Sequence, residues 1–260
     1  MQLAGRVALI TGTGSGIGQA AAVCLAQAGA RVAAVDRSPE SSQETIDKIR
    51  QNGGEAISAT ADVSKPDQGK QAIQETIERF GRIDIVFANA GINGTWAPID
   101  DLEPDEWEQT LNVNLTGTFL TVKYAMPYLK RQGGSVIINS SVNGTRIFSN
   151  TGATAYACSK AAQVAFAKML ALEVAPDRVR VNVICPGAIS TNIDESTEQR
   201  NLDEVNNLVE FPQGRVPLTG GDPGRPEQVA QLVLFLASDM SDHITGTEIW
   251  IDGAESLLQG

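Results

Sequence analysis

Near the start of the chain stands the stretch Val7-Ala8-Leu9-Ile10-Thr11-Gly12-Thr13-Gly14-Ser15-Gly16-Ile17-Gly18. Its apolar beginning predicts a buried strand that runs directly into a glycine-rich turn. An alanine-rich helical pattern follows at 19–29, and a second strand at 31–35 ends in Asp36. A strand, a glycine turn, a helix, a strand and an acid within about 30 residues form the pattern of a dinucleotide-binding unit. The stretch therefore predicts a doubly wound, Rossmann-type α/β fold.

The glycines explain how such a turn binds a pyrophosphate. They let the backbone turn tightly and approach the phosphates, while the following helix N-terminus offers N–H groups and positive dipole. The commonest template needs a third glycine at position 17, where this chain has isoleucine, so the pattern is Thr-Gly-x-x-x-Gly-x-Gly. A turn with only a structural role is the alternative, and Asp36 favours the cofactor. We expect cofactor contacts from Gly12, Ser15, Gly16, Ile17 and Gly18.

The acid at the end of the second strand predicts which dinucleotide binds. Asp36 would accept hydrogen bonds from both hydroxyls of the adenosine ribose and would repel a 2′-phosphate, which favours NAD over NADP. Arg37 follows directly and could offset part of that repulsion, so some use of NADP stays open. Asp62 and Val63 follow the next strand at the same edge of the sheet. Asp62 is either an adenine contact or a turn cap.

The alternation of strands and helices continues to the end of the chain. Helical patterns occupy 41–52, 66–80, 105–130, 154–175 and 227–237, and strand patterns occupy 56–60, 83–88, 134–139, 179–184 and 247–251. Residues 191–224 are polar and turn-rich, and this stretch is too long for a simple connector. It is either a disordered insert or a substrate lid, and its place after a strand's carboxyl end favours the lid. We expect a single domain over 1–260.

Composition and charge exclude several classes of partner. Hydrophobic residues make up 42% and charged residues 20%, as in soluble globular proteins. A net charge of -11 repels phosphate backbones and anionic membranes, so we expect neither a nucleic-acid nor a membrane role. No signal-peptide pattern or membrane-spanning run is present in the sequence. Three scattered cysteines (Cys24, Cys158 and Cys185) and a lone His243 predict a reduced, cytoplasmic protein without a metal site.

A proton-transferring pair is suggested by Tyr156 and Lys160. They stand four positions apart in an alanine-rich helical run, so they share one helix face. A nearby ammonium favours the phenolate and lowers the pKa of the phenol. The alternative is an ordinary surface pair.

Together these motifs make the chain resemble the short-chain dehydrogenase/reductase family over essentially its whole length. The shared features are Thr11-Gly12-x-x-x-Gly16-x-Gly18, Asn89-Ala90-Gly91, Asn114, Ser140-Ser141, Tyr156-x-x-x-Lys160 and Pro186-Gly187. The resemblance implies a seven-stranded parallel sheet with helices on both faces, usually assembled as a homotetramer.

The same resemblance implies roles for individual residues. Tyr156 would be the acid/base, and Lys160 would bind the nicotinamide ribose and lower the pKa of the tyrosine. Ser141 would orient the substrate oxygen, and Asn114 would hold a water that links Lys160 to solvent. The cofactor would also be supported by Asn89, Gly91, the backbone of Pro186-Gly187-Ala188-Ile189 and the hydroxyl of Thr191.

Two adjacent serines could fill the catalytic position, and several residues could contact the substrate. Adjacent strand residues face opposite sides, and the family pattern Ser-Ser-x-x-Gly selects Ser141 over Ser140. The loop at 144–155 is longer than usual in the family and would line the pocket. Candidate substrate contacts are Trp96, Asn143, Arg146, Phe148 and Ile189, with surface loop residues as the alternative for 143, 146 and 148.

We therefore expect an NAD-dependent oxidoreductase that interconverts a secondary alcohol and a ketone, on a small polar substrate, by hydride transfer with tyrosine-based proton transfer. One alternative is an NADPH-dependent 3-oxoacyl carrier-protein reductase, which would need a basic docking patch; Asp36 and the net charge count against it. Another is a dinucleotide-sensing protein without chemistry, which would not need to retain Asn114, Ser141, Tyr156 and Lys160 together.

Overall fold

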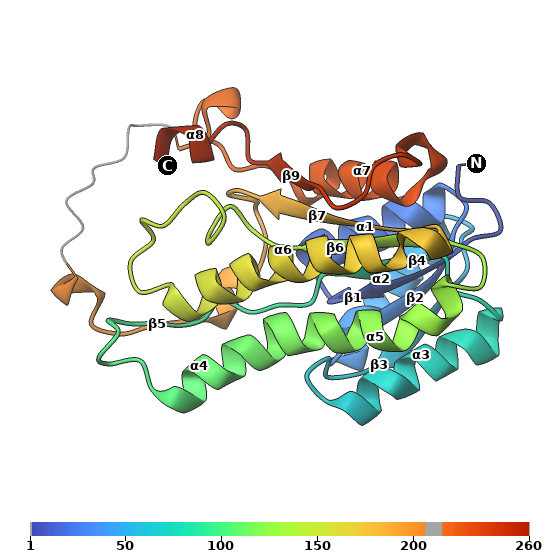
Figure 1. Cartoon of the computed structure of the whole chain (residues 1–260), viewed down its shortest axis with the longest axis horizontal. Helices are drawn as coiled ribbons and strands as arrows, with labels where there is room; N and C mark the ends of the chain where they lie inside the picture. Colours follow the sequence, from blue (N-terminus) through green and yellow to red (C-terminus); the bar gives the residue numbers. More distant parts are fainter. Residues whose placement is uncertain (1, 206–214, 260) are drawn as a thin grey trace.

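A central parallel sheet organises the molecule (Figure 1). The structure is a computed structural model that describes residues 2–205 and 215–259. All pairings in this sheet are parallel, in the order β3-β2-β1-β4-β6-β7-β9. The strands are β1 (Val7–Thr11), β2 (Arg31–Asp36), β3 (Ala56–Thr60), β4 (Ile85–Ala88), β6 (Gly134–Asn139), β7 (Val179–Pro186) and β9 (Glu248–Ile251). The expected seven-stranded parallel sheet is confirmed.

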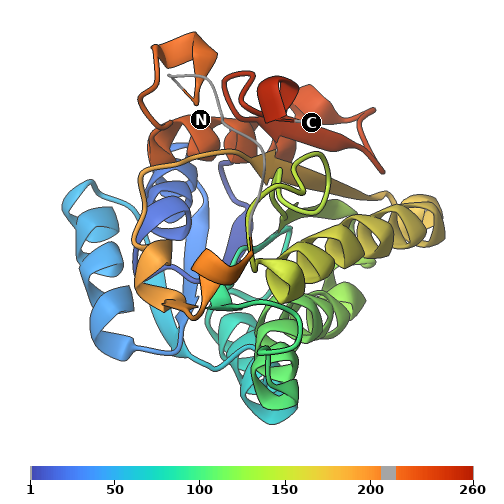
Figure 2. The same cartoon turned by 90° about the vertical axis from the view of Figure 1, so that its left-hand side faces the viewer.

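Helices cover both faces of the sheet because its strands are apolar on both sides. In β1, Val7 and Leu9 belong to one buried cluster and Ala8 and Ile10 to the other. Figure 2 shows the blue helices and the green-to-yellow helices on opposite sides of the sheet. One face carries α1 (Gly16–Gln27), α2 (Pro39–Gln51) and α7 (Pro226–Ala237); the other carries α3 (Pro66–Phe80), α5 (Gly117–Leu129) and α6 (Thr154–Val174).

The order of the strands creates a crevice at their carboxyl ends. From β1 the chain continues to β2 and β3 on one side, then crosses to β4 on the other, and ligands bind at such a switch point in open α/β sheets. The loops after β1 and β4 touch there, since a Cβ on Gly12 would lie 2.9 Å from the Cα of Ala90.

Two local features were not predicted. The helical stretch at 105–130 is broken into α4 (Pro104–Leu111), a π-helical turn (Asn112–Thr116) and α5. In addition, β5 (Gly94–Trp96) pairs in parallel with β8 (Thr197–Gln199), so the proposed lid is attached to the loop after β4.

The lid stretch is described at 191–205 and 215–224, and its part at 206–214 lies outside the described residues. The remaining elements are α8 (Ser256–Gln259) and short 3-10 turns at Ala175–Asp177, Ile193–Ser196, Leu202–Glu204, Pro217–Thr219 and Asp239–Ser241. None of the helices in the described part of the chain has the length and hydrophobicity needed to cross a bilayer.

Candidate active site

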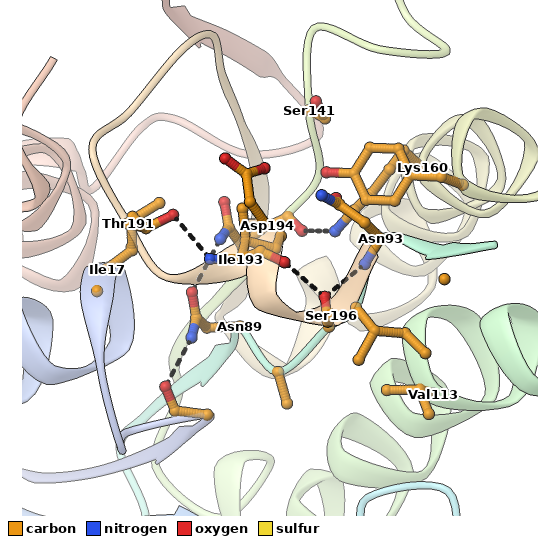
Figure 3. A pocket seen from close by; sticks show the side chains of 18 of the residues that line it. Ile17, Asn89, Asn93, Val113, Ser141, Lys160, Thr191, Ile193, Asp194 and Ser196 are labelled. Atoms are coloured by element: carbon orange, nitrogen blue, oxygen red, sulfur yellow. Dashed lines mark hydrogen bonds between the residues drawn. The ribbon is translucent and has the colours of Figure 1, made fainter. Parts of the chain in front are cut away.

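A cavity of about 1340 Å³ opens at the carboxyl ends of the central strands. It brings together the glycine turn, the ends of β2, β3, β4, β6 and β7, the start of α6 and the lid. In Figure 3, Ile17 and Thr191 lie toward one end of the pocket, and Ser141 and Lys160 toward the other. Of the expected site residues, the cavity is lined by Gly12, Ser15, Gly16, Ile17, Gly18, Asp36, Asp62, Val63, Asn89, Gly91, Trp96, Ser141, Asn143, Tyr156, Lys160, Pro186, Gly187, Ile189 and Thr191.

The glycine turn has the shape that a pyrophosphate site needs. Gly12 and Gly16 have φ of 70° and 52°, which side-chain-bearing residues rarely adopt. A Cβ on Gly18 would lie 1.9 Å from the carbonyl oxygen of Gly12. The turn therefore exposes backbone to the cavity where the N-terminus of α1 begins, and these residues fit a dinucleotide.

The ribose end is formed by Asp36. Its Oδ2 accepts the Gly14 amide at 2.8 Å and its Oδ1 accepts the Ser38 amide at 3.1 Å, which orients the carboxylate at the cavity wall. Arg37 lines the same wall. Asp62 caps a turn, accepting the amide and hydroxyl of Ser64. It also lines the cavity, and its contact with adenine stays a prediction.

The loop after β4 is fastened to the glycine turn through Asn89. The side-chain amide of Asn89 donates to the carbonyls of Thr11 and Gly12 at 2.9 and 3.2 Å, and its Oδ1 accepts from Asn139 at 2.8 Å. Sequence analysis did not single out Asn139. It contributes twice, because its backbone carbonyl also accepts the Lys160 ammonium at 2.8 Å.

Tyr156, Lys160 and Ser141 meet at the other end of the cavity. Their exposed fractions are 7%, 3% and 7%, so the pair on α6 is not a surface pair. The hydroxyl of Ser140 donates to the backbone carbonyl of Lys160 at 2.8 Å, whereas an interaction with the side chain of Ser141 acts to lower the pKa of Tyr156. Of the two serines, 141 is therefore the one beside the phenol, and its part in orienting a substrate stays a prediction.

One electrostatic expectation is wrong. We expected Lys160 to lower the pKa of Tyr156, but burial dominates and raises the pKa of the phenol to about 12, against the opposing hydrogen bond with Ser141. Burial also lowers the pKa of Lys160 to about 8. The ammonium lies 5.4 Å from the centre of the Tyr156 ring and donates to Asn139 rather than to the phenol oxygen.

Asn114 lies behind the cavity wall, in the π-helical turn. Its Oδ1 accepts the Ile92 amide at 2.8 Å, and its Nδ2 donates to the Ile92 carbonyl at 2.9 Å and to Ser159 at 3.0 Å. A Cβ on Gly91 would lie 3.1 Å from Asn114 Oδ1 and 3.6 Å from Lys160 Nζ. Asn114 thus joins the loop after β4 to α6, close to Lys160.

The expected substrate contacts divide into two groups. Trp96 and Asn143 line the cavity, but Phe148 is 76% exposed and is absent from its lining. Arg146 stacks on the Trp250 ring, with its guanidinium carbon 3.7 Å from the ring centre. The loop at 144–155 turns these two side chains away from the cavity.

The stretch proposed as a lid is attached to the loop after β4 and to α4 by polar contacts as well as by the β5–β8 pairing. Asn93 binds Ser196 and Thr197 at 3.0 and 2.8 Å. Arg200 forms a two-pronged ion pair with Glu106 of α4 at 2.9 and 2.7 Å. This pair holds the pKa of Glu106 down at about 2.

Comparison with known proteins extends over nearly the whole chain. Residues 12–254 match the model of a family described as Enoyl-(Acyl carrier protein) reductase. The chain is 38% identical to the 3-oxoacyl-[acyl-carrier-protein] reductase FabG of Thermotoga maritima, over 97% of this chain and 98% of the relative.

Solved structures are similar as well. The crystal structure of a 3-ketoacyl-ACP reductase from Sinorhizobium meliloti 1021 matches with a TM-score of 0.93 and 52% identity, covering 97% of this chain and 99% of that one. Carveol dehydrogenase from Mycobacterium avium, in complex with NAD, matches with a TM-score of 0.88 and 28% identity, covering 98% and 99%. The glycine turn from residue 12 onward and the Tyr156 helix lie within the family match over residues 12–254.

Proposed function

Because the chain belongs to the short-chain dehydrogenase/reductase family, we propose that it is an NAD-dependent dehydrogenase that interconverts a secondary alcohol and a ketone. The broader class is established: the protein is an NAD(P)-dependent oxidoreductase acting on CH–OH or ketone groups. One observation carries the finer proposal, namely that Asp36 and the buried Tyr156–Ser141–Lys160 group line a single cavity.

The proposed chemistry follows from the positions of the side chains. A nicotinamide bound in the cavity supplies the acceptor for the hydride that leaves the carbinol carbon. The hydroxyl proton of the alcohol passes to the deprotonated oxygen of Tyr156, and the ketone forms. Ser141 donates a hydrogen bond to the reacting oxygen and fixes its position beside the phenol. In the reverse direction Tyr156 returns the proton.

Lys160 and Asn114 support this proton transfer. The Lys160 ammonium lies 5.4 Å from the centre of the Tyr156 ring, so its positive charge stands beside the group that takes the proton. With a pKa lowered to about 8, Lys160 can also exchange a proton close to neutral pH. Asn114 fixes the backbone of Ile92 against α6 and so keeps the wall beside Lys160 in place.

We assign NAD rather than NADP because of Asp36. Its carboxylate is held by two backbone amides and cannot swing away from a 2′-phosphate without losing both bonds. Arg37 is exposed and can approach the same ribose position, which leaves room for weak NADP use.

A second candidate is a 3-oxoacyl carrier-protein reductase, favoured by the names of the Thermotoga and Sinorhizobium relatives. Acidic carriers dock on basic surfaces. The lining of this cavity instead carries Asp105, Glu108, Asp194, Glu195 and Glu198 toward the lid, which counts against a carrier-bound substrate.

We also propose that the protein is a cytoplasmic homotetramer. Three large apolar side chains on α5 and α6 are exposed: Phe119 to 41%, Met169 to 77% and Leu172 to 82%. Such exposure in a single chain is expected for side chains that a second subunit covers. The three cysteines are free, as in a reducing compartment.

The proposed function is tested by following NADH formation at 340 nm over sugars, polyols, secondary alcohols, hydroxy acids and 3-hydroxyacyl thioesters. We expect turnover of a small polar alcohol with NAD. A strong preference for a 3-hydroxyacyl carrier-protein thioester with NADP would support the second candidate instead, and no turnover of any alcohol would contradict both.

A further inference from the structure

A buried carboxylate in the C-terminal segment faces the same cavity as the catalytic group. Glu255 follows β9 and precedes α8, is only 7% exposed, and lines the cavity together with Ser141 and Tyr156. Burying a carboxylate is costly unless hydrogen bonds or charges compensate. Its Oε2 accepts the Ala188 amide at 2.7 Å.

The surrounding backbone is shaped to bring this carboxylate to the cavity wall. A Cβ on Gly187 would lie 2.4 Å from Glu255 Oε2, so the close approach requires glycine there. The preceding carbonyl, of Pro186, accepts the amide of Val142 at 2.9 Å, and Val142 directly follows Ser141. Glu255 is thus connected through one short loop to the strand end that carries the catalytic serine.

The residue before Glu255 has a strained backbone conformation. Ala254 has φ of 71°, in the left-handed region that residues with side chains rarely occupy. Asp252 stabilises the turn by accepting the amides of Ala254 at 3.2 Å and Ser256 at 2.9 Å. Strain that is maintained by supporting bonds is typical of functional sites.

Glu255 retains acceptor capacity toward the cavity. A carboxylate offers about four acceptor positions, and the Ala188 amide uses one. Burial raises the pKa of Glu255, while the Ala188 bond and the charge of Arg215 act to lower it. Away from the adenosine end, the described lining carries six carboxylates and two cations: Asp105, Glu108, Asp194, Glu195, Glu198 and Glu255 against Lys160 and Arg215.

We propose that Glu255 is a specificity-determining residue that accepts a hydrogen bond from a second donor group on the substrate, a hydroxyl or an ammonium. This proposal rests on the function proposed above and names the substrate class of the same site. The substrate is then a diol or an amino alcohol. Monofunctional alcohols are poorer substrates because they lack the second donor, and hydroxy acids are poorer substrates because Glu255 repels their carboxylate.

The test compares the wild type with Glu255→Gln. Glutamine can still accept the Ala188 amide, so the loop keeps its bond while the charge is lost. Glu227→Gln is the matched control, because Glu227 is exposed at the start of α7 and is not part of the cavity lining. The probes are cyclohexanol, cis-1,2-cyclohexanediol, cis-2-aminocyclohexanol and 3-hydroxybutyrate.

Two readouts are taken with each probe: kcat/KM with NAD, and Kd from the ligand-dependent shift in Tm. For the diol or the amino alcohol, we expect Glu255→Gln to raise Kd and lower kcat/KM by about tenfold or more, because a hydrogen bond to a charged group is lost. The values for cyclohexanol should change less than about threefold, and Glu227→Gln should behave like the wild type.

The two proposals can fail separately. The role of Glu255 would be overturned if the wild type and Glu255→Gln had equal Kd values for both the diol and the amino alcohol. It would also be overturned if the wild type bound neither of these two probes more tightly than cyclohexanol. A wild type that binds these probes but oxidises none of them would instead overturn the proposed dehydrogenase function. Loss limited to the amino alcohol would assign an ammonium donor, and loss limited to the diol a hydroxyl.

Discussion

Replacing Lys160 by methionine should stabilise the ligand-free protein while removing its activity. The pKa of this ammonium is lowered from 10.5 to about 8, and the largest cause is burial. At about 1.4 kcal/mol for each pH unit, the buried charge costs about 3 kcal/mol at neutral pH. Methionine fills a similar volume without the charge, but it loses the bond from Lys160 to the Asn139 carbonyl, worth about 1 kcal/mol. The net gain is therefore about 2 kcal/mol.

The difference in stability between Lys160→Met and the wild type should depend on pH. Below pH 8 Lys160 is protonated in both the folded and the unfolded chain, so the full cost of the buried charge is present. Between pH 8 and 10.5 the unfolded chain binds more protons, and the stability of the wild type rises with pH. The advantage of Lys160→Met should therefore be largest at pH 7 and should shrink steadily toward pH 10.

The assay is urea unfolding of both proteins at pH 7, 8.5 and 10, at one protein concentration because subunit association also stabilises. Turnover with NAD is measured on the same samples. A variant that is less stable than the wild type at pH 7, or a stability difference that is the same at all three pH values, would refute the burial argument.

Three further changes test other parts of the site. Asp36→Asn removes the charge that faces a 2′-phosphate, so the ratio of the NADPH to the NADH dissociation constant should fall by about tenfold or more; an unchanged ratio in fluorescence titrations would contradict the role of Asp36. Gly18→Ala places a Cβ 1.9 Å from the Gly12 carbonyl oxygen, so it should lower the free energy of unfolding in urea by about 1–3 kcal/mol and weaken NADH binding. Stability and affinity equal to those of the wild type would show that the turn can move to accommodate the Cβ. Arg200→Ala breaks the ion pair with Glu106 that holds the proposed lid, so limited proteolysis should cut this segment faster at an unchanged Tm. An unchanged cleavage rate would show that the β5–β8 pairing alone holds the segment in place.

The alternation of strands and helices could be predicted because each signal is local. Apolar runs such as Val7–Thr11 and Val179–Pro186 are buried on both faces, and the residues that follow them mark the carboxyl edge of the sheet. The helix Pro66–Phe80, which has a proline at its start, was predicted with its observed bounds. The family resemblance then predicted the number of strands in the sheet and the meeting of Ser141 with Tyr156.

Features that depend on distant partners were missed. The π-helical turn contains Asn114, whose bonds to Ile92 and Ser159 no helical periodicity reveals. Strands β5 and β8 have three residues each and pair across about a hundred positions, too short and too far apart for a sequence signal. Glu255 looks like an ordinary surface acid until its burial is known.

The pKa of Tyr156 shows the same limit in electrostatics. The spacing to Lys160 predicted that the two groups share a helix face, but spacing carries no information on burial. Burial of the phenol outweighs the opposing hydrogen bond with Ser141, and the pKa rises. A bound cofactor and substrate must change that balance for Tyr156 to accept a proton near neutral pH.

The most direct test of the account is Tyr156→Phe, which removes one oxygen from a side chain that is already buried. We measure the steady-state rate of NAD reduction with the best alcohol of the substrate screen, and the dissociation constant of NADH by fluorescence titration, for this variant and the wild type. We expect the rate to fall by at least about a hundredfold while the dissociation constant changes less than about threefold. Turnover that survives the loss of the phenol oxygen would contradict this expectation.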